Sequence, residues 1–379
     1  MPPGPENAYS VYTELVQRLT RAVDIEQALM AQYLYAAFAI KPKYENLRGR
    51  GRISEHYDLL GVAVEEMRHL HIASLLLARL GVRPNIGLVS FPFDFNPYRF
   101  KLELKPLSAE TLAQYVYIEA QDSDVSLSNP DQAFITRLRS KLGNSYDPIP
   151  PPSIYEAIIR NLKDLIKDPP YDLLPVAHEL PSWVERLEAV RGNGIHEHFT
   201  FFRHVFMGTS ALVADPQNRN VWDLSKLDPD YPSYSLLLET DGDVADEFDL
   251  RKDEARAHAR LARLHYWIIV SLLNMTYRFD DWDDPEDGQP RRYLDLAQHH
   301  MRGPLLKVGA HLASKGLGLP FVKLPQEYIW DNEDAAKETV RGFVNEADEL
   351  AHDLFEAKTL ANGFKLNIYS ITTSRLSVK

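Results

Sequence analysis

The sequence predicts an all-α protein, in which a helical bundle over residues 1–210 is followed by a C-terminal helical extension over residues 211–379. Three observations predict this class. Apolar residues recur at helical spacing, the periodic segments are separated by Gly, Pro and Asp clusters, and the strand signal is weak throughout. The length of 379 residues also exceeds the roughly 250 to 300 at which a single core stops growing, so helices beyond one bundle are expected.

The first two helices are predicted from their ends as well as from their periodicity. The first is expected over residues 24–40, with Asp24 at its start, and the second over residues 54–80, before Gly81. A proline-rich stretch over residues 82–107 follows, and its length suits a crossover connection. Further helices are expected over residues 108–120, 129–143, 153–166, 180–191, 194–206, 253–277, 293–315 and 333–360.

Charge and composition exclude several classes of partner and site. Lys and Arg total 42 against 54 for Asp and Glu, a net charge of −12 without a dense basic block, so nucleic acid and anionic membrane are not expected partners. The chain has no cysteine, so any metal must be held by oxygen and imidazole nitrogen. The apolar stretches are too short to span a membrane, and the start, MPPGPENAYS, lacks the pattern of a signal peptide; a cytoplasmic protein is expected.

The most specific feature is an E-x-x-H pattern in the middle of the second predicted helix. Positions three residues apart lie on one face of a helix, so Glu66 and His69 should point the same way. The apolar neighbours of Glu66 on that face make it an inward face: Val62, Ala63, Leu70 and Ala73. A buried carboxylate needs a counter-charge, which indicates a metal ion. Glu65 is a weaker candidate, because its own face includes Gly61 and Arg68.

Glu26 occupies a similar position on the first predicted helix, in an apolar stripe that includes Leu29 and Tyr33. The alternative is a solvated helix edge or an ion pair with an arginine such as Arg68.

Three further residues are candidate ligands, each with an ordinary alternative. His198 lies on an apolar face and could be a satisfied core histidine. Glu119 ends the third helix and could be exposed there. Glu156 could close a capping box with Ser153 instead of binding metal, but a bundle site needs a fourth carboxylate.

A second set of histidines lies later in the chain. Glu254, His258 and His265 share one face of a predicted helix, but further acids are lacking, so packing is favoured over metal binding. His299, His300 and His311 are isolated and are not predicted as ligands, and His196 and His204 are expected to be peripheral.

Several segments together resemble the ferritin-like domain of the iminophenylpyruvate dimer synthase type, found in bisindole pathways such as that for violacein. The resemblance extends to about Pro320, and its most specific part is EEMRHLHIASLLLARLG. The other segments that carry it are IEQALMAQYLYA, PLSAETLAQYVYIEA, HEHFTFFRHV, ARLARLHYWIIVSLLNMTY and HHMRGPLLKVGAHLASKGLGLP.

The resemblance implies a four-helix core whose metal ligands are Glu26, Glu66, His69, Glu119, Glu156 and His198. A symmetric dimetal bundle would contain a second E-x-x-H, but the residue three before His198 is Ile195. The acid partner of His198 is therefore open, with Glu156 and Glu197 as replacements, and a one-metal site stays an alternative.

The expected function is oxygen-dependent oxidation of a small molecule in specialised metabolism. Four carboxylates would balance two Fe(II) ions, and oxygen and imidazole donors also suit manganese. The expected partners are a small-molecule substrate and dioxygen, while a homodimer and a pathway partner enzyme both stay open. Two alternatives are oxidative coupling of two imines, as in the dimer synthases, and a metal-binding or interaction protein that has lost catalysis.

Overall fold

The computed structural model describes residues 5–49, 57–94, 98–151, 153–193, 197–236, 252–279 and 292–356. The chain folds as two compact units. The first comprises Met1–Pro84 and Pro92–Ser233, and the second comprises Asn85–Phe91 and Tyr234–Lys379. Almost all regular structure is helical, which confirms the predicted all-α class; within the described residues the one sheet is a two-stranded ladder of β1 (Phe93–Asp94) and β2 (Lys101–Leu102). None of the helices described here combines the length and apolar character that a membrane span requires.

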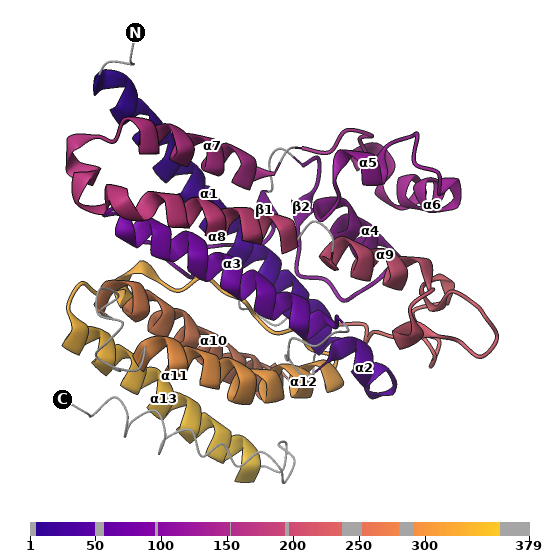
Figure 1. The fold of residues 1–379 in the computed structure, drawn as a ribbon. Coiled ribbons are helices and arrows are strands. Elements are labelled where there is room, and N and C mark those ends of the chain that lie inside the picture. The colour runs from indigo at the N-terminus through magenta and orange to yellow at the C-terminus, as the bar shows by residue number, and fades with distance from the viewer. Residues whose placement is uncertain are drawn as a thin grey trace. The chain divides into compact units, whose positions relative to one another are not determined.

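The first unit is organised around two long helices, α1 (Pro5–Phe38) and α3 (Leu59–Arg79), which pack along each other (Figure 1). Near the start of α1 the Tyr12 hydroxyl donates a hydrogen bond to the carbonyl of Leu80 at 2.8 Å, so the two helices run antiparallel. The end of α3 leads into residues 82–107, which connect it to α4 (Ala109–Ile118).

The third helix of the bundle is divided into two helices that follow one another in the chain. α4 (Ala109–Ile118) begins with a capping box between Ser108 and Thr111, and α7 (Ile154–Lys167) begins after Ser153. Between them the chain forms the short helices α5 (Asp122–Val125) and α6 (Gln132–Leu142). α7 packs on α1, whereas α4 packs on α9 (Phe199–Met207), so the two helices have different packing partners.

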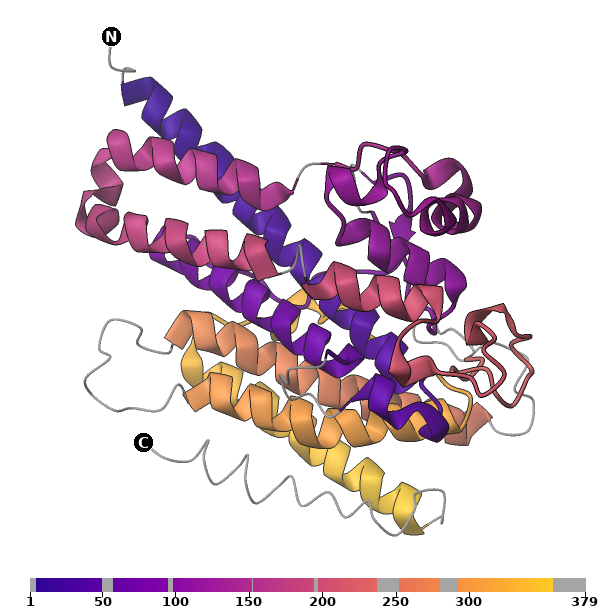
Figure 2. The ribbon, with the colours of Figure 1, turned by 45° about the vertical axis from the view of Figure 1, so that its right-hand side comes forward.

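The fourth helix of the bundle is also divided into two helices, α8 (Leu180–Asn193) and α9 (Phe199–Met207), which follow one another in both views (Figure 2). α8 packs on α7 and on α3. Residues 194–196, between α8 and α9, are outside the described residues. The predicted helix over 194–206 is observed from Glu197 onwards, first as two π-helical residues and then as α9.

The predicted starts of the first two helices are wrong. The second helix begins at Leu59 and not at residue 54, because Asp58 caps it and Tyr57 is not helical; residues 54–56 lie outside the described residues. The first helix begins at Pro5, not at Asp24, because apolar residues such as Leu15 and Leu19 already form a fully buried stripe before Asp24. Proline is well tolerated at the first helical position, where its missing N–H is not needed. Asp24 is half-buried in mid-helix, and this burial raises the pKa of its carboxyl.

The second unit contains α10 (Lys252–Phe279), α11 (Arg292–His300), α12 (Leu306–Ser314) and α13 (Glu333–Glu356). α10 packs on α11, α12 and α13, and a short π-helical segment, Met301–Leu305, joins α11 to α12. Asn274 fixes the segment Asn85–Phe91 to α10, because its side chain accepts from the Ile86 N–H at 2.9 Å and donates to the Ile86 carbonyl at 2.8 Å.

Candidate metal centre

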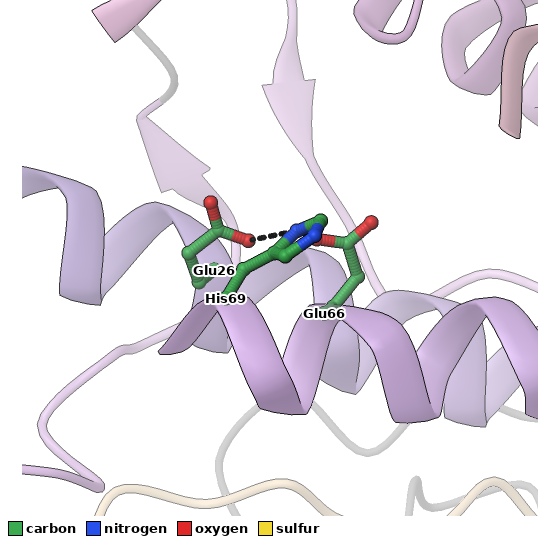
Figure 3. Close-up of side chains that lie close together, drawn as sticks. All are labelled: Glu26, Glu66 and His69. Carbon is green, nitrogen blue, oxygen red and sulfur yellow. Dashed lines mark hydrogen bonds and ion pairs between the residues drawn. The ribbon is translucent and has the colours of Figure 1, made fainter. Parts of the chain in front are cut away.

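The E-x-x-H pattern lies on the buried face of α3, as predicted. Asp58 caps this helix by accepting a hydrogen bond from the Gly61 N–H at 2.7 Å, which sets the start of the helix. Glu66 and His69 are then both buried, and Figure 3 shows their side chains leaving α3 and turning towards Glu26 of α1 (Figure 3). The helical spacing alone places these two groups together, and the packing of α1 on α3 brings Glu26 to them.

Glu26, Glu66 and His69 form a first group that could hold a metal ion. Each offers one ligand atom, and these atoms lie within 4.8 Å of one another. His69 Nδ1 is 3.1 Å from Glu66 Oε2 and 3.7 Å from Glu26 Oε2. All three side chains are buried, so bulk water does not screen their charges.

Glu66, Glu119 and His198 form a second group of the same kind. His198 Nδ1 is 3.1 Å from Glu66 Oε1 and 3.7 Å from Glu119 Oε2. Glu119 is the residue after the last turn of α4, and His198 immediately precedes α9. Glu66 therefore belongs to both groups, with Oε2 towards His69 and Oε1 towards His198.

A layer of hydrogen bonds surrounds these two groups. Tyr155 donates to Glu26 Oε1 and Tyr33 donates to Glu119 Oε1, both at 2.6 Å. The other ring nitrogen of His198, Nε2, lies 2.6 Å from Glu65 Oε2. A histidine held in this way by a carboxylate keeps its opposite nitrogen for a metal, as in many protein metal sites.

The protonation of the cluster is set by burial and by its own charges. Burial, helped by the neighbouring charge of Glu66, raises the pKa of Glu26 to about 8, although His69 opposes the shift. Burial tends to lower the pKa of His69, but Glu66 and Glu26 outweigh it and raise the pKa to about 10. Burial likewise opposes a rise at His198, yet Glu119, Glu65 and Glu66 hold its pKa well above the ordinary value.

Glu66 shows the opposite balance. Burial acts to raise its pKa, but the charges of His69 and His198 and the hydrogen bond with His69 dominate, so the pKa lies well below the ordinary value. The protein without metal thus compensates its buried carboxylates with protons on the histidines and on Glu26.

Two buried atoms of the cluster without hydrogen-bond partners indicate whether a metal ion fits. Glu26 Oε2 and His198 Nδ1 are buried and make no hydrogen bond to any of the described residues, although both face the centre of a three-ligand group. A buried polar atom without a partner costs about 1–3 kcal/mol. A cation bound between the ligands would satisfy both atoms, so the residues fit a metal ion in each group.

Five of the six predicted ligands come together: Glu26, Glu66, His69, Glu119 and His198. Glu156 does not. Its side chain is exposed on the first turn of α7, because the neighbouring Tyr155 takes the inward direction and reaches Glu26 instead. The Ser153 hydroxyl caps α7 by accepting from the Tyr155 N–H, so no capping box with Glu156 is seen either.

Sequence reasoning missed Glu65, which is buried and pairs with His198 across 133 residues of chain. Its face was judged outward because of Gly61 and Arg68. Gly61 is buried, however, and Arg68 alone is exposed. Glu197, the other proposed partner of His198, is exposed, and Ile195 and His196 lie outside the described residues. His204 is peripheral as expected, with Nδ1 3.0 Å from the Thr209 hydroxyl.

Four histidines of the second unit lie in two pairs, His265 with His300 and His258 with His311. His265 Nδ1 is 2.8 Å from His300 Nε2, and the rings of His258 and His311 lie 4.9 Å apart. Burial lowers the pKa of His265 to about 3, so this imidazole is neutral and packs in the core. The structure does not describe the side chain of Glu254.

Comparison with family models supports the ferritin-like superfamily for the bundle. Residues 19–172 match the model described as Ferritin-like. The matched residues include Glu26, Glu66, His69 and Glu119, and they end before His198. Comparison with curated proteins and with solved structures gives no match.

Proposed function

We propose that the ferritin-like bundle holds two iron ions and uses them for oxygen-dependent oxidation of a small molecule. The observation that carries the proposal is Glu66, which offers one oxygen to each of two three-ligand groups. A shared carboxylate between two groups of this kind is what a dimetal site in a helical bundle requires.

Charge supports two divalent ions. Glu26, Glu65, Glu66 and Glu119 supply four negative charges when ionised, and two divalent ions supply four positive ones, so the loaded cluster would be nearly neutral. The sequence predicts the same balance of four carboxylates against two divalent ions, but with Glu156 where the structure has Glu65. The carboxylate and imidazole donors suit iron, with manganese as the alternative.

Each residue has a separate role in this proposal. Glu66 would offer one oxygen to each ion, while Glu26 with His69 and Glu119 with His198 would complete the two groups. Glu65 accepts a hydrogen bond from the Nε2–H group of His198 and so directs Nδ1 towards the metal. Two bound Fe(II) ions would supply two electrons to dioxygen.

The resemblance to the iminophenylpyruvate dimer synthase type suggests an amino-acid-derived imine or ketone as substrate. Oxidative coupling of two imines is the reaction of that type, and it is a specific form of the same proposal. It predicts that indole-3-pyruvate imine is consumed only when this protein is present.

Anaerobic loading with Fe(II), followed by dioxygen, tests the proposed function. About two irons per chain and the appearance of a ferric species are expected, and Glu66→Ala should lose both. Glu156→Gln is the matched control, because Glu156 is an exposed glutamate of the same bundle. If the wild type forms no ferric species and Glu66→Ala keeps full activity, the proposal is wrong. Iron that binds but does not react with dioxygen would indicate a metal-binding protein without catalysis.

A further inference from the structure

Two buried tyrosines make equivalent contacts on the two outer glutamates of the cluster. Tyr155, at the start of α7, donates to Glu26 Oε1, and Tyr33, in α1, donates to Glu119 Oε1. Both O···O distances are 2.6 Å, in the range of strong hydrogen bonds to a carboxylate. The tyrosines come from different helices, so a single local motif does not explain the repetition.

Each of these hydrogen bonds occupies one oxygen of a carboxylate and leaves the other oxygen facing a histidine. With Oε1 of Glu26 held by Tyr155, the oxygen that faces His69 Nδ1 is Oε2, at 3.7 Å. Glu119 shows the same division, because its Oε2 lies 3.7 Å from His198 Nδ1.

We propose that Tyr155 and Tyr33 are positioning residues that restrict Glu26 and Glu119 to one ligand oxygen each. This inference rests on the proposed function, because it requires metal ions in both groups. A carboxylate that binds through both oxygens fills two coordination positions, whereas one held at its outer oxygen fills one. Each ion therefore keeps a position for dioxygen or substrate.

The alternative is that the hydroxyls only satisfy buried carboxylates and have no effect on the ions. The two roles differ when the hydroxyl is removed. Under the proposal, Tyr155→Phe frees Glu26 Oε1 to join the nearby ion and raises its coordination number. If the role is only structural, the coordination of the ion does not change.

Cobalt(II) is the probe, because its visible absorption weakens as its coordination number rises to six. The full-length chain would be loaded with Co(II) and its absorption measured per bound ion. Tyr155→Phe and Tyr33→Phe are each expected to lose intensity, and the double variant should lose the sum of the two. Tyr115→Phe is the matched control: Tyr115 is fully buried with its ring 4.8 Å from that of Tyr33, but its hydroxyl donates to the Gln32 carbonyl.

The outcomes separate this inference from the proposed function. If the wild type binds no Co(II), the dimetal site itself is contradicted. If it binds two ions and both phenylalanine variants keep the wild-type spectrum, only the positioning role is overturned. Infrared spectra of the metal-loaded wild type give a test without any variant, since carboxylate bands typical of chelation by both oxygens at Glu26 and Glu119 would also overturn it.

Discussion

Substitution of Glu65 by glutamine tests the outer contact of His198 with the smallest change in shape. Glu65 Oε2 lies 2.6 Å from His198 Nε2, and both side chains are buried. The amide can still accept the hydrogen bond, but it no longer supplies the negative charge that orients the imidazole and raises its basicity. Loss of such an outer partner typically costs 10–100-fold in metal affinity, which corresponds to about 1.4–2.8 kcal/mol.

The effect should fall on one ion, because Glu65 contacts His198 and not His69. Anaerobic calorimetric titration with Fe(II) should show the weaker binding of one ion, while the affinity of the other stays within about threefold of the wild type. Glu197→Gln is the matched control. It removes the same charge from the residue next to His198, but its side chain is exposed, so solvent screens the change.

Two results would refute the reasoning. If Glu65→Gln leaves both affinities unchanged, the contact with His198 does not tune the metal. If both ions are lost together, Glu65 is a direct ligand or a residue that the whole cluster needs in order to fold. Circular dichroism of the metal-free variant distinguishes the last two cases.

Three further predictions concern other parts of the molecule. Glu156→Gln should leave iron stoichiometry and affinity unchanged, as measured by the same titration, because its carboxylate is exposed; a loss of one iron would restore Glu156 as a ligand. Metal binding at pH 7 should release protons, because Glu26 and His69 have pKa values of about 8 and 10 and must lose their protons to bind. Calorimetry in buffers of different ionisation enthalpy measures the number of protons released. The metal affinity should also fall as the pH is lowered. The free energy of unfolding should fall below about pH 6.5 by up to about 1.4 kcal/mol per pH unit because of His265. The folded pKa of His265, about 3, lies below its unfolded value, so the unfolded chain takes up a proton that the folded chain does not. Urea unfolding between pH 7 and 4 measures the slope, which His265→Phe should reduce.

The sequence predicts the inner part of the site because helical spacing is a local property. Glu66 and His69 share a face of one helix, and that face is otherwise apolar, so their burial follows from the pattern. Glu26 is predicted for the same reason on its own helix. The helical class also follows from periodicity, and the start of the third predicted helix follows from its cap, Ser108.

The outer part of the site depends on contacts between segments far apart in the chain, which periodicity does not encode. Glu65 was set aside because Arg68 shares its face, yet a long helix between two packed layers buries more than one face. Gly61, one turn earlier on the same face, is buried as well. Glu156 was chosen for its charge, whereas the adjacent Tyr155 holds the inward position.

Anomalous diffraction from a crystal loaded anaerobically with Fe(II) tests the central claim most directly. The account predicts two peaks at the iron edge, one between Glu26 and His69 and one between Glu119 and His198, with Glu66 bound to both ions. A map without iron at these residues, or with Glu66 bound to neither peak, would contradict it.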